Sequence, residues 1–311
     1  GLGWAMGYAG GLICLVIVLA FFSASPDTGK TMLGFLPWFG LDPETYEGAR
    51  ATGPFTAIWY ILFVIPLFLL TPDTARNFDI PNFGAALRSG VADLRETFAN
   101  LKNYGNVVRY LVSRMIYADG LVALFAFGGI YGASVFGWSI TELGIFGILL
   151  TIAGLIGALV GGRLDDSLGP KIIIQISLVI LALGSLGILS IDKDTIFFII
   201  PVAHEAGAGG GAFSTLPEQV YLALGAVIGF AAGPVQAASR TLLIRVAPPE
   251  KLTQFFGLFA LTGKVTSFIG PTLVGIVTAV SGSQRIGISI LLVFFAIGFV
   301  GLFGVRVPAA K

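Results

Sequence analysis

Eight long stretches of the chain are almost entirely apolar, and polar residues gather between them. Each is long enough to cross a bilayer core of about 30 Å as a helix, which needs roughly 20 residues. Their apolar positions are continuous and do not alternate with polar ones, as they would in the strands of a membrane β-barrel. Because backbone N–H and C=O groups must be satisfied within hydrocarbon, the pattern predicts an all-α, polytopic membrane protein. The predicted spans are 3–22, 54–71, 107–135, 141–161, 172–191, 218–244, 253–280 and 286–305.

The connection 72–106, between the second and third spans, has a different pattern. Apolar residues recur there at intervals of four and three, which places them on one face of a helix, namely Leu87, Val91, Leu94, Phe98 and Leu101. Charged residues occupy the other face, so we predict an amphipathic helix on the cytoplasmic membrane surface. This connection would divide residues 1–71, with two spans, from residues 107–311, with six.

Composition agrees with a protein that faces lipid. Of its 311 residues, 56% are hydrophobic and 11% charged, whereas about 25% of an average soluble domain is charged. The net charge of +1 provides no basic patch for nucleic acid. The single cysteine, Cys14, excludes a disulfide or thiolate metal site within the chain. We expect no cofactor and no metal, and the only histidine, His204, lies in a Gly-rich connection and is not expected to be catalytic.

The distribution of Lys and Arg between the connections predicts the orientation. If the first residue is cytoplasmic, twelve basic residues lie on that side: Arg76, Arg88, Arg95, Lys102, Arg109, Arg163, Lys171, Arg240, Arg245, Lys251, Arg306 and Lys311. The opposite side holds four: Lys30, Arg50, Lys193 and Arg285. Both ends of the chain are therefore expected to be cytoplasmic. The chain enters an apolar span directly at Gly1 without the basic region of a signal peptide, and we interpret this start as a truncation.

The connection between the fourth and fifth spans carries a motif. Residues 162–171 read GRLDDSLGPK and resemble the G-x-L-x-D-x-x-G-x-K loop of the major facilitator superfamily, with matches at Gly162, Leu164, Asp166, Gly169 and Lys171. Ser167 and Pro170 depart from basic residues that the family often has. In that family, the motif follows the second helix of each six-helix half, on the cytoplasmic side.

The resemblance therefore implies that the chain holds the last eight of twelve helices, with four N-terminal helices missing. It also implies that Asp166 pairs with a basic group between the halves and favours one of two rocking states. The alternative is a tight turn that merely carries charges at two helix ends.

Four further segments resemble the vacuole-effluxer branch of this superfamily. They read GWAMGYAGG at 3–11, YADG at 117–120, QAASR at 236–240, and FGLFALTGK at 256–264 with Gly270-Pro271 after it. That branch includes an autophagy-related amino-acid effluxer of fungi and bacterial relatives. The resemblance implies a secondary transporter for a small solute, with amino acids as the substrate class. It also implies a bacterial cytoplasmic membrane, or a vacuolar membrane if the source is eukaryotic.

Ionisable side chains inside a membrane span are costly and mark candidate sites. In the third span, Arg114 and Tyr117 share a face, whereas Asp119 lies about 140° from Arg114 around the helix. Asp119 is about 18 Å from the start of its span, and Lys264 is about 16 Å from the start of the seventh, at 1.5 Å per residue. Because the two depths are similar, we hypothesise that Asp119 and Lys264 face a common cavity.

Several roles are open for these residues. Lys264 would bind the carboxylate of a zwitterionic solute and Asp119 its ammonium group. Alternatively, Asp119 titrates and couples transport to protons, or the two side chains form a structural salt bridge. Gln236 and Arg240 share a face of the sixth span, where Arg240 either lines the site or extends to the cytoplasmic surface.

Glycine and proline predict where helices approach or break. Spacings of four between small residues let helix backbones come close, as at Gly157 and Gly161 and in the set Gly3, Gly7 and Gly11. Pro234 and Pro271 each follow a glycine and are predicted to bend or break the sixth and seventh spans.

Two other classes of function compete with a transporter. A membrane-embedded enzyme acting on lipid needs a catalytic constellation, yet the chain has no H-E-x-x-H, no histidine cluster and no phosphate-binding G-x-x-x-x-G-K-[ST]. A channel usually needs a filter built by repetition, and no repeated filter sequence appears; a non-transporting receptor remains an alternative. The preferred prediction is a transporter whose partners are a small solute, protons and the lipid bilayer.

Overall fold

The computed structural model describes residues 1–26, 28–72, 83–99, 101–202 and 212–308. Within these ranges, eight helical segments are long and apolar enough to cross a membrane, which confirms the predicted all-α, multi-pass architecture. They are Leu2–Phe22, Glu47–Leu70, Lys102–Phe136, Ile140–Leu168, Pro170–Leu189, Leu216–Val246, Pro249–Ser281 and Gln284–Phe303. Arg76, His204 and Lys311 lie outside the described residues.

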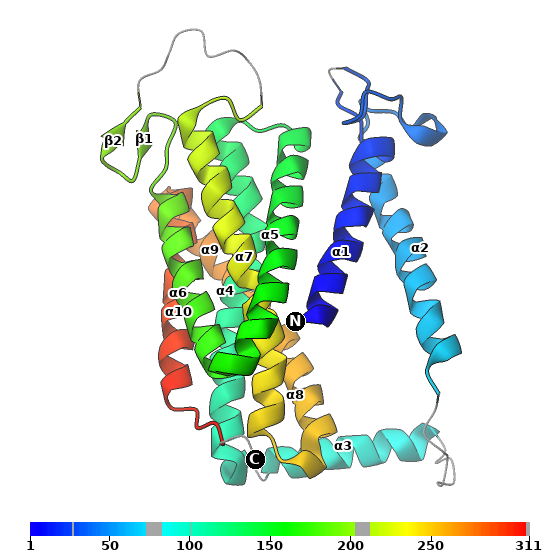
Figure 1. Cartoon of the computed structure of the whole chain (residues 1–311), viewed down its shortest axis with the longest axis vertical. Coiled ribbons are helices and arrows are strands. Elements are labelled where there is room, and N and C mark those ends of the chain that lie inside the picture. The colour runs from blue at the N-terminus through cyan, green and yellow to red at the C-terminus, as the bar shows by residue number, and fades with distance from the viewer. Residues whose placement is uncertain (27, 73–82, 100, 203–211, 309–311) are drawn as a thin grey trace. The chain divides into compact units, whose positions relative to one another are not determined.

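The chain forms two compact units, Gly10–Asn100 and the combination of Gly1–Ala9 with Leu101–Lys311. The helix α1 (Leu2–Ile17) begins in the larger unit, and its part after Ala9 belongs to the smaller unit. There α1 continues as a π-helical turn, Val18–Phe22, and α2 spans Glu47–Leu70 (Figure 1). A Cβ added at Gly48 would lie 2.8 Å from the carbonyl carbon of Phe22, so only glycine lets these segments approach so closely. Much of α2 exposes large apolar side chains, as a helix facing lipid does.

The connection after α2 contains the predicted amphipathic helix, α3, which spans Phe83–Ala99. Leu87 and Val91, from its predicted apolar face, are 60% and 58% exposed. A helix thus forms within this connection, and its amphipathic role stays a prediction. Its position on a membrane surface stays a prediction, as does the division of the chain at residues 72–106.

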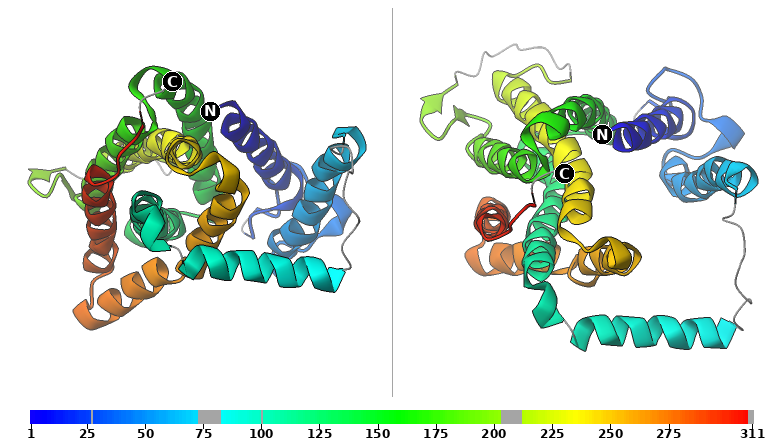
Figure 2. Two further views of the ribbon diagram at one scale, coloured as in Figure 1. Left: turned by 90° about the horizontal axis from the view of Figure 1, so that it is seen from below. Right: turned by 60° about the horizontal axis from the view of Figure 1, so that its bottom comes forward.

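The larger unit is a bundle in which the other helices surround α4 (Gly105–Phe136), as the views in Figure 2 show. Tyr110 of α4 and Tyr221 of α7 have no exposed surface. A two-residue hairpin follows α6, with β1 (Thr195–Ile196) antiparallel to β2 (Ile200–Pro201). The surrounding helices are α5 (Ile140–Leu168), α6 (Pro170–Leu189), α7 (Leu216–Val246), α8 (Leu252–Val265), α9 (Ile269–Ser281) and α10 (Gln284–Phe303).

Capping boxes determine where α5 and α7 begin. Ser139 and Glu142 exchange side-chain and backbone hydrogen bonds at the start of α5, and Thr215 and Glu218 do so at the start of α7. Such boxes satisfy N–H groups that have no partner within the helix. Glu218 has a second role, because its carboxylate accepts a hydrogen bond of 2.9 Å from the buried indole N–H of Trp138.

Glycine lets α5 and α7 come into backbone contact. A Cβ at Gly157 would lie 2.7 Å from the carbonyl carbon of Phe230, and one at Gly161 would lie 2.5 Å from ring carbons of Pro234. The close packing predicted for this pair of glycines is confirmed. At Gly3 and Gly7, by contrast, an added Cβ meets nothing within 4 Å among the described residues, so the packing expected there stays a prediction.

The two prolines behave differently. The seventh span is broken into α8 and α9, separated by residues 266–268, and Pro271 occupies the first turn of α9, where a missing N–H costs little. Pro234, however, lies inside a continuous α7. Its ring carbons pack against Gly161 of α5, and the helix continues through it. The predicted break thus occurs only in the seventh span.

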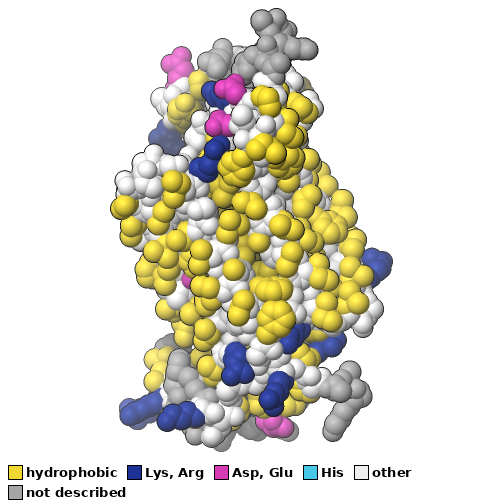
Figure 3. All heavy atoms as spheres, turned by 90° about the vertical axis from the view of Figure 1, so that its left-hand side faces the viewer, with side chains coloured by type: hydrophobic (Ala, Val, Ile, Leu, Met, Phe, Trp, Pro, Cys, Tyr) yellow, Lys and Arg dark blue, Asp and Glu magenta, His cyan; other side chains and the backbone are white. Residues whose placement is uncertain are grey.

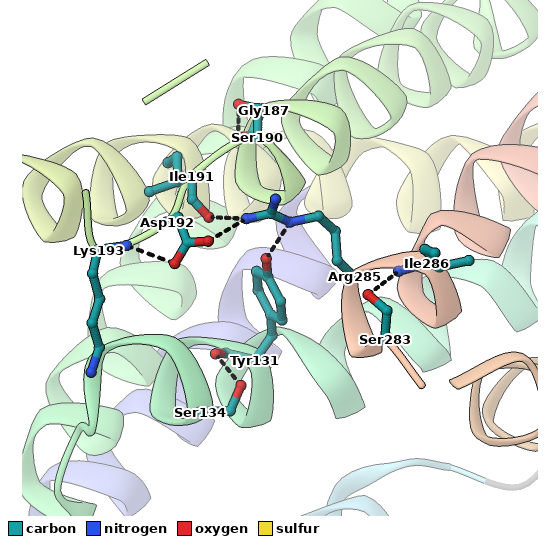
Figure 4. Close-up of polar contacts among 10 residues, drawn as sticks. All are labelled: Tyr131, Ser134, Gly187, Ser190, Ile191, Asp192, Lys193, Ser283, Arg285 and Ile286. Carbon is teal, nitrogen blue, oxygen red and sulfur yellow. Dashed lines mark hydrogen bonds and ion pairs between the residues drawn. The ribbon is translucent and has the colours of Figure 1, made fainter. Parts of the chain in front are cut away.

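Charged groups gather at the ends of the bundle. Figure 3 shows a face whose middle is covered mainly by hydrophobic side chains, with Lys and Arg toward both ends and most densely toward the lower one. At the other end, Arg285 of α10 donates to the Tyr131 hydroxyl at 3.2 Å, the Ile191 carbonyl at 3.1 Å and the Asp192 carboxylate at 3.1 Å (Figure 4). This cluster connects α10, α4 and the turn that follows α6.

Candidate functional site

A cavity of about 300 Å³ lies in the larger unit, bounded by α4, α7, α8 and the first turn of α1. The sequence assigned its ionisable candidate residues to the spans that contain α4, α7 and α8. Five of the six candidates line the cavity: Arg114, Tyr117, Gln236, Arg240 and Lys264. The other lining residues are Trp4, Ala118, Leu121, Val122, Val235, Ser239, Phe259 and Gly263.

Arg114 is held in place by α8. Its guanidinium donates a hydrogen bond of 2.7 Å to the Phe259 carbonyl, and its central carbon lies 3.8 Å from the centroid of the Phe259 ring. One turn later, a Cβ at Gly263 would lie 3.0 Å from that same guanidinium carbon and nearer still to its nitrogens. Phe259 and Gly263, four residues apart, therefore form a flat seat for the guanidinium.

Tyr117 is anchored to α7 through Ser239. Their hydroxyl groups are 2.7 Å apart, and the Ser239 hydroxyl donates to the Val235 carbonyl. Tyr110, two helical turns before Tyr117 in α4, donates to the Ser239 backbone carbonyl. These bonds fix α4 against α7 on one side of the cavity, so Tyr117 presents a fixed wall and not a mobile side chain.

Gln236 and Arg240 lie on the same face of α7, as predicted. The Gln236 amide donates to the Tyr8 hydroxyl and to the Ala232 carbonyl, each at 3.1 Å. Arg240 places its guanidinium carbon 5.2 Å from the centroid of the Trp4 ring, within the range of a cation–π contact. Lys264 lines the cavity from α8 and is exposed.

Asp119 does not line this cavity, contrary to the expectation that it shares one with Lys264. It is 3% exposed, and its carboxylate accepts a hydrogen bond of 3.1 Å from Thr266, at the break between α8 and α9. The rotation of about 140° that separates it from Arg114 around α4 explains this placement. No ion pair joins Asp119 to Lys264 among the described side chains.

The motif at 162–171 is mostly helical and not the loop that the sequence suggested. The helix that leads into the motif, α5, continues to Leu168, and α6 starts at Pro170. Gly169 alone makes the turn, with a φ of 83° that favours glycine. Asp166 is exposed, and the ammonium group of Lys171 donates to carbonyls at the end of α10.

Next to the motif aspartate is a residue that the sequence did not single out. Asp165 is only 7% exposed, and it lies beside Thr241 and Arg245 of α7. One of its carboxylate oxygens has no hydrogen-bond partner. Asp165 and Asp166 are adjacent in sequence, and only the packing of α5 on α7 separates the buried acid from the exposed one.

The predicted site also lacked Phe259, Ser239 and Gly263, which line the cavity beside the candidates. A signal existed for two of them, because Phe259 and Gly263 lie four residues apart in the segment 256–264. Among the described residues, no group of three His, Cys, Asp or Glu side chains lies close enough to hold a metal ion.

The whole chain is similar to a known protein family. Residues 1–311 match the family described as Vacuole effluxer Atg22 like. Autophagy-related protein 22 of Cryptococcus neoformans is 24% identical over 95% of this chain and 48% of its own length. Its counterpart in Kluyveromyces lactis is 25% identical over 83% of the chain and 51% of its own length.

A bacterial relative is also similar. The MFS-type transporter YxiO of Bacillus subtilis, itself uncharacterised, is 20% identical over 96% of this chain and 60% of its own length. The chain therefore spans about half the length of the curated relatives that it matches.

Proposed function

Because the chain belongs to the vacuole effluxer Atg22-like family, we propose that the protein is a secondary transporter that moves a small solute across a membrane by alternating access. The cavity between α4, α7 and α8 carries this proposal. Its basic side chains belong to helices that are otherwise apolar enough to span a bilayer. Such side chains are costly in hydrocarbon unless they line a wet cavity or bind a solute.

The proposed solute contacts are the five candidates that line the cavity. Arg114 and Lys264 supply positive charge, and Tyr117 and Gln236 supply polar groups at a wall fixed by hydrogen bonds. Amino acids are the proposed substrate class, since they are small enough for a cavity of about 300 Å³. In this arrangement, the carboxylate of the amino acid faces Arg114 and Lys264.

Asp119 is proposed as the group that couples transport to protons. It is a buried acid with one hydrogen-bond partner, Thr266, located where the seventh span is broken. Broken helices in transporters frequently rearrange around a central site. Replacing Asp119 with asparagine should abolish concentrative uptake driven by a pH gradient while solute exchange continues. Full concentrative uptake by Asp119→Asn would eliminate the proton-coupling role.

The motif residues Gly162, Leu164, Asp166, Gly169 and Lys171 are proposed to govern the change between two conformations. Gly169 makes the sharp turn between α5 and α6, and Lys171 holds the end of α10, so the three helices would move together. Asp166 is exposed and free to bind a basic group elsewhere in the whole protein. Asp166→Asn should therefore slow exchange more than it weakens solute binding.

Solute counterflow tests the central proposal. The whole protein is reconstituted in liposomes loaded with unlabelled amino acids, and entry of labelled amino acid is followed. A carrier gives a transient accumulation that an enzyme or receptor cannot give. Lys264→Met should reduce this accumulation, whereas Lys193→Gln, at an exposed lysine remote from the cavity lining, should not. The absence of counterflow for every amino acid tested would refute amino-acid exchange.

The orientation is proposed from the bias of Lys and Arg, with both ends of the chain on the cytoplasmic side. With Cys14 replaced by serine, cysteines introduced one at a time at Lys193 and Lys251 should then react with an impermeant maleimide from opposite sides of the membrane. Reaction of both from one side would contradict the proposed topology.

A further inference from the structure

We propose that the cavity recognises its solute through a carboxylate on an apolar skeleton, because its described lining residues offer cations for a carboxylate and no acidic side chain for an ammonium group. The substrate class is thus small apolar organic anions, and amino acids enter it only through their carboxylates. The proposal rests on the transport function argued above and replaces the zwitterion-binding role first expected of Asp119.

Charge is the first observation. The described lining residues include three cationic side chains, Arg114, Arg240 and Lys264, and no Asp or Glu. Three like charges surround about 300 Å³ of space, and one buried acid outside the lining, Asp119, interacts with Arg114. Because the cations outnumber this acid, the local potential attracts an anion. The carboxylate of a zwitterion is attracted by this potential, whereas its ammonium group is repelled.

The second observation is the orientation of Arg114. One of its N–H groups is bonded to the Phe259 carbonyl, and the plane of the guanidinium rests on the Phe259 ring and Gly263. The side chain is therefore immobilised before any solute arrives. A planar guanidinium has five N–H donors, so Arg114 keeps donors beyond the one bonded to Phe259. Such a fork suits a carboxylate, which accepts two parallel hydrogen bonds.

The third observation concerns the acid that would be needed for an ammonium group. Asp119 is 3% exposed and already accepts a hydrogen bond from Thr266, outside the lining. The hydroxyls nearest the cavity, those of Tyr117 and Ser239, are bonded to each other. An ammonium ion in this cavity would thus exchange its water shell for neutral, partly engaged acceptors beside three positive charges.

The remaining walls specify the skeleton of the solute. Leu121, Val122 and Phe259 contribute apolar surface next to the cations. A cavity that combines a few polar anchors with apolar walls binds ligands that have the same division. A branched or aromatic monocarboxylate has one anionic group and an apolar remainder, as these walls require. A small hydrophilic anion would leave the apolar walls in contact with water.

A matched ligand series tests the proposal. Leucine, 4-methylpentanoate and 3-methylbutylamine share one branched skeleton, but the second lacks the ammonium group and the third lacks the carboxylate. Binding to the purified whole protein is measured as a ligand-dependent rise in Tm. We expect 4-methylpentanoate to bind at least as tightly as leucine, and the amine to give no shift. Leucinamide, which has no carboxylate, should behave like the amine.

Two substitutions connect binding to the cavity. Arg114→Gln should weaken 4-methylpentanoate binding by about tenfold or more, as expected for losing hydrogen bonds between charged partners. Because Arg114 is also packed, Lys264→Met serves as a second variant at an exposed position and should weaken binding in the same direction. Lys193→Gln, outside the lining, should leave the affinity unchanged.

The outcomes separate this proposal from the transport function. Tighter binding of leucine or of the amine than of 4-methylpentanoate, or no shift with any member of the series, would overturn anion recognition. Counterflow of amino acids that 4-methylpentanoate does not inhibit would support the transport function but refute recognition of the organic anion. Binding of 4-methylpentanoate without any counterflow would instead support anion recognition at the cavity and refute the transport function.

Discussion

Replacing Gly157 with alanine tests how closely α5 and α7 have to approach. A Cβ at Gly157 would lie 2.7 Å from the carbonyl carbon of Phe230, whereas ordinary van der Waals contact begins at 3.4 Å. The carbon alone would require the helices to separate locally by 0.7 Å, the difference between 3.4 and 2.7 Å, and the Phe230 carbonyl oxygen, which would lie nearer still to the Cβ, requires more. The obstacle is backbone and cannot rotate away as a flexible side chain can, so a helix must move.

The cost of that separation exceeds what alanine adds to helix stability. A gap of about 0.5–1 Å already removes about a quarter to a half of the dispersion energy of each atom pair across it. An extra methyl group in a packed core costs about 1–3 kcal/mol, and a clash with backbone places Gly157 near the upper limit. Alanine recovers about 1 kcal/mol of helix propensity. A net loss of about 2 kcal/mol remains.

Thermal unfolding of the purified protein, followed by tryptophan fluorescence, measures this loss. We expect Gly157→Ala to lower Tm by about 4–8 °C, taking about 2–4 °C per kcal/mol. Gly275→Ala is the matched control, because a Cβ on that glycine of α9 meets nothing within 4 Å. Its Tm should be unchanged or higher. Equal Tm values for the two variants would refute the argument that backbone contact holds α5 to α7.

Two further substitutions test single contacts. Trp138→Phe keeps an aromatic ring but removes the N–H that donates to Glu218 over 2.9 Å, so Tm should fall by the equivalent of about 1–3 kcal/mol; an unchanged Tm would show that the bond contributes nothing. Lys171→Met removes the ammonium group that donates to the Phe303 and Val305 carbonyls at 3.3 and 2.8 Å, so hydrogen exchange at the end of α10 should speed up. Lys171→Arg should exchange more slowly than Lys171→Met, and equal rates in all three proteins would contradict this capping role.

Most of the secondary structure could be predicted because a bilayer restricts the choices. A continuous apolar run of about 20 residues has to become a helix in hydrocarbon, so the number of spans and their approximate ends followed from local composition. The break before Pro271 followed from proline chemistry. Pro234 did not break its helix: it lies inside a continuous α7, where its ring carbons pack against Gly161 of another helix.

The site was only partly accessible to the same reasoning. The cost of charge in hydrocarbon identified Arg114 and Lys264 as candidates, and helical periodicity placed Arg114 and Tyr117 on one face. Periodicity also placed Asp119 on another face of α4. It could not say which helix that face would meet, and the carboxylate is bonded to Thr266 outside the cavity.

By itself, the sequence determined that this is a polytopic helical membrane protein and which spans carry charge, because these properties depend on residues close together in the chain. Tertiary packing alone decided which charges share a cavity, and that Asp165 is buried while Asp166 is exposed. Those outcomes depend on the azimuth of one helix against another. That azimuth is set by backbone contacts such as Gly157 against Phe230, between residues far apart in sequence.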